Sequence, residues 1–151
     1  MRLYVIRAQN LQPKDFNGLA DPYLVLSLGG NIIKDRKNKQ EKTLNPEIFK
    51  RFDFETSLPG PSSLKIQVFD ANEYTSDKII GETSIDLEDR WFHPKWTEIP
   101  IKTKPLEFRS LFTKGTATTQ GLAMLWLDIL NVPEVKTILY IFIYLYILFF
   151  S

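Results

Sequence analysis

The chain has 151 residues, a length typical of one ordinary domain, and 44% of them are hydrophobic, so a single packed core is expected. Lysine and arginine number 19 against 18 acidic residues, and this balance argues against a nucleic-acid binder held by long-range attraction to phosphate. The lack of cysteine excludes disulfide scaffolds and thiol catalysis, and the single histidine, His93, excludes multi-histidine metal sites.

Short blocks of alternating hydrophobicity predict β-strands along most of the chain. In chain order they cover residues 3–6, 23–28, 48–54, 64–69, 79–87, 96–101 and 122–130. A less regular, basic strand is expected within 33–43, which makes about eight strands and predicts an all-β sandwich. No segment before residue 130 has a helical pattern, and 103–121 is expected to be a long mobile surface excursion.

Residues 137–151 form an apolar tail without any charged side chain. As a helix this tail would rise about 22 Å, which is short of the roughly 30 Å hydrocarbon core of a bilayer. Its aromatic and β-branched content also matches an aggregation-prone segment. We therefore expect a folded domain at 1–130 and a hydrophobic C-terminal tail at 131–151, which is either a partial membrane segment or a truncated or alternatively encoded end.

Oxygen-bearing side chains are concentrated in two of the predicted loops. Asp15 and Asp21 bracket the first loop. Asp70, Asn72 and Asp77 lie together in an eight-residue stretch of a later loop. Oxygen ligands without imidazole or thiolate suit a hard cation, and ligands drawn from flexible loops favour Ca²⁺ over Mg²⁺. The spacing differs from that of a helix-loop-helix calcium loop. Acidic turn residues that only cap and solvate their loops are the alternative.

Two further sets of side chains are candidates for contact with a membrane. Apolar residues at the expected loop tips are Phe16, Leu19 and Tyr74. The segment 34–42 carries a local charge of +3, which favours an anionic leaflet, and its basic residues are Lys34, Arg36, Lys37, Lys39 and Lys42. Ordinary loop exposure and an edge strand guarded by lysine are the alternatives for these two sets.

Enzymatic activity is not expected from this sequence. His93 lies in the turn WFHPKW without a matching acid-base partner, and no nucleophile elbow, P-loop or dinucleotide fingerprint is present. We therefore expect no small-molecule substrate. The aromatic side chains of this turn are expected to anchor the edge of the core, and a docking site for a protein partner is the alternative.

Three motifs, taken in order, carry a resemblance to a known family. PKDFNGLADPYL at 13–24, TLNP at 43–46, and VFDAN at 68–72 followed by IIGE at 79–82 resemble the C2 domain, a calcium-dependent lipid-binding module. The runs IGETSIDLEDR and QGLAMLWLDIL are similar to C2 domains of the ferlins, which are large multi-C2 proteins of membrane fusion and repair. The resemblance covers roughly residues 1–130.

This resemblance implies an eight-stranded antiparallel β-sandwich of type II topology, in which 122–130 supplies the eighth strand. Three loops would meet at one end, around 13–22, 43–47 and 70–78. The implied function is targeting to anionic phospholipid at the cytoplasmic face of vesicle or plasma membranes, with weak or vestigial Ca²⁺ dependence. A Ca²⁺-independent protein-interaction C2 domain within a larger scaffold is the alternative.

The resemblance also implies a ligand set for Ca²⁺, with two departures from the family pattern. Asn72 stands where a second aspartate of the third loop is usual, and Lys78 stands where the final aspartate would lie. A lysine ammonium near a divalent ion opposes its binding. We therefore expect one weak Ca²⁺ site built on Asp15, Asp21 and Asp70 and assisted by Asn72 or Asp77.

Overall fold

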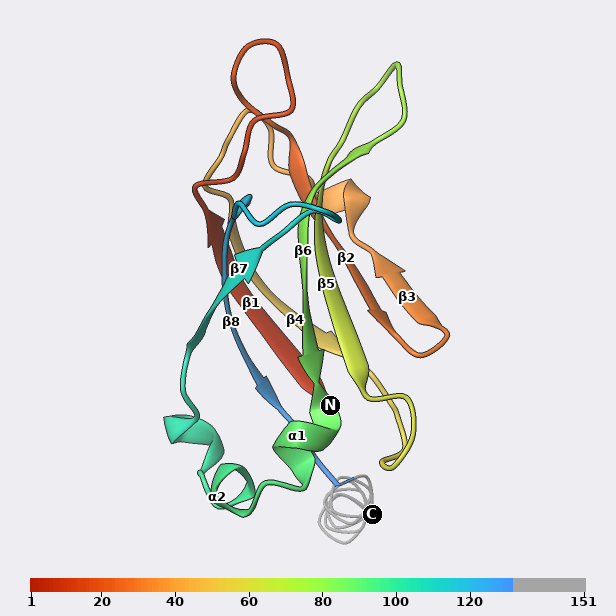
Figure 1. Cartoon of the computed structure of the whole chain (residues 1–151), viewed down its shortest axis with the longest axis vertical. Helices are drawn as coiled ribbons and strands as arrows, with labels where there is room; N and C mark the ends of the chain where they lie inside the picture. Colours follow the sequence, from red (N-terminus) through yellow and green to blue (C-terminus); the bar gives the residue numbers. More distant parts are fainter. Residues whose placement is uncertain (132–151) are drawn as a thin grey trace, which may run out of the picture.

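The computed structural model describes residues 1–131, which form a sandwich of two four-stranded antiparallel sheets (Figure 1). The predicted tail at 131–151 lies, apart from its first residue, outside the described residues. The strands are β1 (Arg2–Gln9), β2 (Pro22–Leu28), β3 (Asn31–Lys34), β4 (Glu47–Asp53), β5 (Ser63–Asp70), β6 (Lys78–Asp86), β7 (Glu107–Leu111) and β8 (Gly121–Asp128). The all-β prediction is confirmed.

The last described strand, β8, is an interior strand of its sheet, whose order is β4-β1-β8-β7, while the other sheet has the order β3-β2-β5-β6. Leu3 of β1 pairs with Leu127, and Ala8 pairs with Ala123, in antiparallel register. The strand predicted at 122–130 therefore completes the sheet beside the first strand, as the type II order requires.

The core lies between the two sheets and is filled by the inward-facing side chains of each strand. Leu3 and Val5 of β1, Ile66 and Val68 of β5, and Leu125 of β8 are almost completely shielded from water. Every second residue of a strand points to the same face, so alternating hydrophobicity buries one face of each sheet. Burying a side chain of this kind stabilises the fold by about 1.5–3 kcal/mol.

The prediction of a strand at 96–101 is wrong, because this part of the chain is helical. Pro94 occupies the first turn of a short helix, where its missing N–H and fixed φ are favourable, and Trp96 is buried against the core. The helices here are α1 (Leu87–Trp91), α2 (Pro94–Thr97) and the 3₁₀ turn η2 (Ile101–Thr103). Within residues 1–131, no helix has the length and hydrophobicity needed to cross a membrane.

The surface excursion predicted at 103–121 contains the edge strand β7, which the sequence pattern did not reveal. Leu111 is buried, but Phe108 is exposed, so the alternation is weak. Gly81 of β6 explains how β7 reaches the second sheet, because a Cβ atom at this position would lie 2.9 Å from the Cβ of Leu111. A backbone bridge between Glu82 and Phe112 joins the sheets at the same place.

The basic strand predicted within 33–43 is only partly present. Strand β3 ends at Lys34, and the chain continues as the 3₁₀ turn η1 (Arg36–Asn38). Asp35, directly before this turn, is buried and accepts hydrogen bonds of 2.6 and 2.8 Å from the Lys50 ammonium of β4. This ion pair links the end of β3 to β4, which are edge strands of the two sheets.

Candidate functional site

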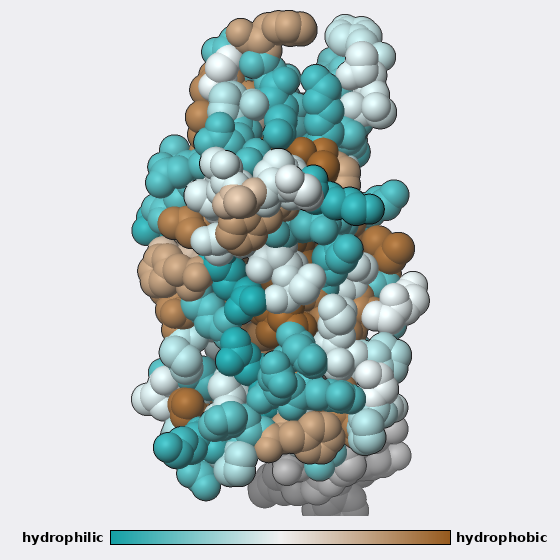
Figure 2. Space-filling view, in the orientation of Figure 1, coloured by the Kyte–Doolittle hydropathy of each residue, from teal (hydrophilic) through white to brown (hydrophobic). Residues whose placement is uncertain are grey.

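Two loops project from one pole of the sandwich, as Figures 1 and 2 show. The first loop (residues 10–21) joins β1 to β2, and the third loop (71–77) joins β5 to β6. They lie at the same pole because β2 and β5 are antiparallel neighbours, so that Pro22 at the start of β2 pairs with Asp70 at the end of β5. The β3–β4 connection (residues 35–46) passes beside them and carries η1.

Asp70 ties the first loop to the third. Its side chain is completely buried, and one carboxylate oxygen accepts a 2.7 Å hydrogen bond from the backbone N–H of Asp21. The side-chain amide of Asn72 donates to the other oxygen at 3.3 Å. A buried carboxylate needs such donors, because water does not reach it. Asp70 therefore has a structural role in the loop pole.

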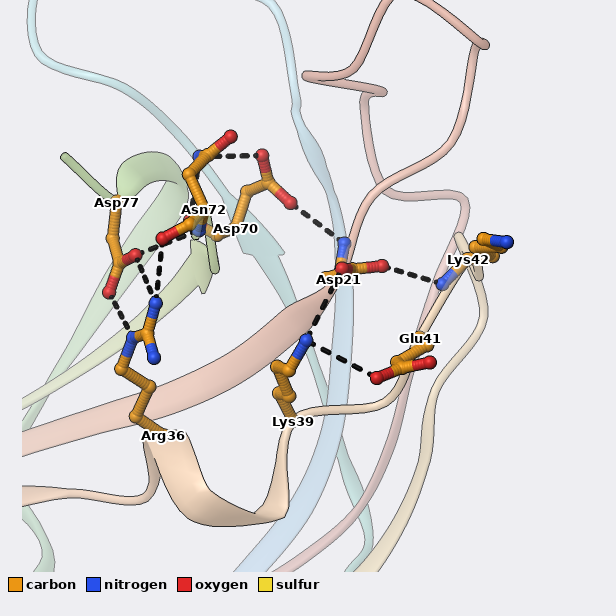
Figure 3. A network of polar contacts seen from close by, with 8 residues as sticks. All are labelled: Asp21, Arg36, Lys39, Glu41, Lys42, Asp70, Asn72 and Asp77. Atoms are coloured by element: carbon orange, nitrogen blue, oxygen red, sulfur yellow. Dashed lines mark hydrogen bonds and ion pairs between the residues drawn. The ribbon is translucent and has the colours of Figure 1, made fainter. Parts of the chain in front are cut away.

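Asp77 of the third loop is held by Arg36 of the β3–β4 connection (Figure 3). The Arg36 Nε lies 2.8 Å from one carboxylate oxygen and its Nη2 lies 3.0 Å from the other, while Nη2 also donates to the Asn72 carbonyl at 2.8 Å. The Tyr23 hydroxyl donates to Asp77 at 2.8 Å. Hydrogen bonding from Arg36 is the main reason why the pKa of Asp77 lies well below its ordinary value.

The buried surroundings of Tyr23 and its hydrogen bond to Asp77 raise the pKa of the phenol to about 12. The sequence offered no signal for this participation of Tyr23 or for the pairing of Arg36 with Asp77. Arg36 and Asp77 are 41 residues apart, and Arg36 stands in a segment whose composition indicated a free basic patch.

Asp21 of the first loop is held by the same connection, through other residues. The Lys39 ammonium lies 3.6 Å from one of its carboxylate oxygens, and the backbone N–H of Lys42 donates to the other at 2.7 Å. Lys39 also lies 3.3 Å from the carboxylate of Glu41. Burial acts to lower the pKa of Lys39, but its contacts with Glu41 and Asp21 together raise it. Both oxygens of Asp21 are therefore engaged.

Asp15 lies on the first loop at the same pole. Its pKa is raised, first by desolvation and then by the negative charges of Asp70 and Asp21, while Lys78 opposes the shift. Asp15 belongs to the same β1–β2 loop as Asp21, whose backbone N–H donates to Asp70 at the end of β5, so the three carboxylates belong to chain segments at one end of the sandwich.

This arrangement does not fit a strong Ca²⁺ site. Ca²⁺ takes six to eight oxygen ligands, whose lone pairs must be available to the ion. The carboxylate oxygens of Asp77 accept hydrogen bonds from Arg36 and Tyr23, and those of Asp21 face Lys39 and the Lys42 amide. Between residues 1 and 131, no three acidic or histidine side chains are arranged to hold a metal ion.

The side chains predicted to contact lipid have different environments. Phe16 and Tyr74 are fully exposed at the two loop tips, whereas Leu19 is half-buried. In Figure 2 the first loop ends in hydrophobic atoms and the surface below it is hydrophilic. Of the five basic residues predicted to form one patch, Arg36 and Lys39 face the acidic loops. No ion pair in the described part of the chain involves the other three, which are Lys34, Lys37 and Lys42.

A two-sheet sandwich with an interior last strand and acidic loops at one pole is the architecture of a C2 module. The chain belongs to the C2 domain family, since the family model described as C2 domain matches residues 1–100. It is 43% identical to human myoferlin over 91 residues, and 35% identical to ferlin 2 of Toxoplasma gondii over 136 residues. These alignments cover 60% and 87% of this chain but only 4% and 10% of the two relatives. The resemblance to ferlin C2 domains is confirmed.

Solved structures show the same fold. A single C2 domain of plant extended synaptotagmin 1 matches with a TM-score of 0.64 and 23% identity, covering 82% of this chain and 88% of that chain. A calcium-bound structure of two C2 domains of extended synaptotagmin 2 matches with a TM-score of 0.57 and 25% identity, covering 92% of this chain and 49% of that one.

Proposed function

We propose that this C2 domain is a non-catalytic membrane-targeting module that binds anionic phospholipid at the cytoplasmic face of membranes, with weak or vestigial Ca²⁺ dependence. Ferlin-type vesicle fusion and membrane repair is the proposed setting. The proposal rests on the end of the sandwich where the first and third loops meet. There the rings of Phe16 and Tyr74 are exposed at the tips of loops that also carry charged residues.

The free lysines near this pole supply the attraction to an anionic surface. Lys34, Lys37 and Lys42 form no ion pair with any residue in the described part of the chain. At about 1 kcal/mol for each basic residue near an anionic leaflet, the three contribute roughly 3 kcal/mol, which salt reduces by screening. Partial insertion of two aromatic rings adds apolar burial that salt does not weaken.

A weak Ca²⁺ dependence is supported by the contacts of the acidic loops. Asp77 and Asp21 already have cationic partners, and Asn72 has no charge to offer. Lys78 follows Asp77 directly and lowers the negative potential at the pole. The extended synaptotagmin 2 structure, which is calcium bound, shows that a similar fold in another protein holds the ion.

A non-catalytic role is supported by the position of the one histidine. His93 is exposed and precedes α2, at the end of the sandwich opposite the loop pole (Figure 1). An exposed imidazole in a turn, far from the acidic cluster, has no acid-base partner near a concave site. A protein-interaction role is the second candidate, and it is favoured by the exposed aromatic side chains of Phe49, Phe92 and Phe108.

Vesicle co-sedimentation of the full chain tests this function. We expect binding to phosphatidylserine vesicles but not to phosphatidylcholine vesicles, with little difference between a chelator and about 1 mM Ca²⁺. Replacing Phe16 and Tyr74 together by Ala should weaken binding about tenfold or more, since removing apolar burial worth about 1.4 kcal/mol is a tenfold loss. Equal pelleting with both lipids would contradict the proposal.

A matched control is Ile32→Ala, which removes an exposed apolar side chain from β3, away from the loops. This variant should bind vesicles as the unaltered chain does. Because every protein in the comparison keeps the same C-terminal tail, differences between them report on the loops. Binding that survives high salt but is lost in the Phe16 and Tyr74 variant would assign most of the affinity to the aromatic tips.

A further inference from the structure

The β3–β4 connection places two of its cations on one side. Arg36 begins the 3₁₀ turn η1, and Lys39 follows its last residue. A 3₁₀ helix has three residues per turn, so side chains three residues apart lie on the same side of it. Both cations can therefore face the acidic loops, while Lys37 between them is exposed. Figure 3 shows Arg36 and Lys39 reaching the loop carboxylates from this connection.

Each of these cations takes a carboxylate from a different loop. Arg36 forms a two-pronged contact with Asp77 of the third loop, and Lys39 lies against Asp21 of the first. The backbone N–H of Asp21 in turn donates to Asp70 at the end of β5. The three connections at this pole are therefore joined by one continuous polar network, and all of its donors and acceptors are side-chain or backbone groups of the protein.

The charge of this network matches what an ion would provide. Asp21, Asp70 and Asp77 contribute three negative charges, Glu41 beside Lys39 contributes a fourth, and close carboxylates repel one another unless cations lie between them. Arg36 and Lys39 together contribute +2, which is the charge of one Ca²⁺ ion. A tethered cation cannot diffuse away, so its effective concentration at the pole stays high.

The environment of these pairs separates them from ordinary surface salt bridges, which stabilise a protein little. The side chains of Asp77, Lys39 and Asp21 are 19%, 21% and 22% exposed, while that of Arg36 is 47% exposed. Arg36 meets Asp77 in the two-pronged geometry that makes guanidinium–carboxylate contacts specific, and it also binds the Asn72 carbonyl.

We propose that Arg36 and Lys39 are resident cations that take the place of a divalent ion at the loop pole. They hold the first and third loops in one arrangement without metal, so that the aromatic loop tips are ready to meet a membrane at any Ca²⁺ concentration. The part of this inference that concerns lipid rests on the proposed function. The part that concerns loop order does not.

The test compares two double variants of the full chain that remove the same charge from the same segment. Arg36→Gln with Lys39→Gln removes the resident cations, and Lys34→Gln with Lys37→Gln removes two exposed cations without a carboxylate partner in the described residues. Amide hydrogen exchange of residues 71–77 should accelerate about tenfold or more in the first variant only, because a loop that loses its contacts opens more often.

Vesicle binding in chelator should fall in both double variants, because Lys34 and Lys37 attract the anionic surface directly, so the exchange rates of residues 71–77 are the measurement that separates the two variants. Arg36→Lys, which keeps the charge but loses the two-pronged contact, should give intermediate exchange rates. Equal exchange rates of residues 71–77 in the two double variants would overturn the proposal. If the unaltered chain binds no vesicles, the proposed function fails, while the exchange comparison still decides whether Arg36 and Lys39 order the loops.

Discussion

The backbone amide of Asp21 donates a 2.7 Å hydrogen bond to the fully buried carboxylate of Asp70, and this contact joins two loops that are 49 residues apart. A carboxylate that the family resemblance implied as a metal ligand thus has a structural partner here. The contact makes the loop pole part of the folded core of the domain. Its contribution to stability can be measured.

Replacing Asp70 by Ala should destabilise the domain by about 1–3 kcal/mol, because it leaves the Asp21 N–H and the Asn72 amide without an acceptor. Asp70→Asn keeps one side-chain oxygen and should lose less. Urea denaturation of both variants measures the difference. Equal losses for Asp70→Asn and Asp70→Ala would show that the charge, and not the hydrogen bond, holds the loops.

The Lys104 ammonium should be the most important cation for the stability of the helical segment. It lies 3.6 Å from Asp128 of β8 and 3.7 Å from the centre of the Trp96 ring, and both charged side chains are under 10% exposed. Lys104→Met should destabilise the domain by about 3–5 kcal/mol, since a buried carboxylate loses its partner.

The neighbouring Lys102 is exposed and provides the control for this measurement. Lys102→Met should change the free energy of unfolding by less than about 0.5 kcal/mol. Adding Asp128→Asn to Lys104→Met should recover part of the loss, because no unpaired charge then stays buried. Equal losses for the Lys102 and Lys104 variants would refute this role.

Deleting residues 120–131 should unfold the domain. The deletion removes β8, which contributes Leu125 and Leu127 to the core and pairs with both β1 and β7. Shortening the exposed β7–β8 loop by removing 114–117 should leave the fold intact, because loop length affects stability only weakly. Circular dichroism and thermal melting distinguish the two outcomes, and a cooperative transition in the first deletion would exclude the observed strand order.

Acid should weaken the contact of Asp77 with Arg36. The pKa of Asp77 lies below its ordinary value of 3.8, so its stabilising effect is complete above about pH 4 and is lost as the pH falls through the lower folded-state value. Asp77→Asn should therefore melt below the unaltered chain near neutral pH, and the two melting temperatures should converge below about pH 4. A gap that stays constant as the pH falls from about 4 to about 2 would rule out the carboxylate as its cause.

Titration with Ca²⁺ should reveal weak binding to the unaltered chain, with a dissociation constant no tighter than about 0.1–1 mM, as in the weaker calcium modules. Removing Arg36 and Lys39 as competitors should strengthen binding, because Asp77 and Asp21 would then have free oxygens. Isothermal calorimetry supplies the affinities. A micromolar constant for the unaltered chain would contradict the weak dependence proposed above.

Alternating hydrophobicity was sufficient to predict most strands, because burial of one sheet face is a local property of each segment. It failed at 96–101, where Pro94 starts a helix, and at β7, where the exposed Phe108 hides the alternation. Loop positions were predicted from turn residues, and the exposure of Phe16 and Tyr74 at their tips agrees with that prediction.

The sequence by itself determined the sandwich, the positions of its loops and the acidic and basic character of the segments beside them. Only the tertiary structure decided which charges meet, because pairing depends on the register of β2 with β5 and on the turn at η1. Composition presented residues 34–42 as one basic patch, but folding divides it. Arg36 and Lys39 pair with loop carboxylates far away in the chain, and Coulomb attraction acts on spatial distance alone.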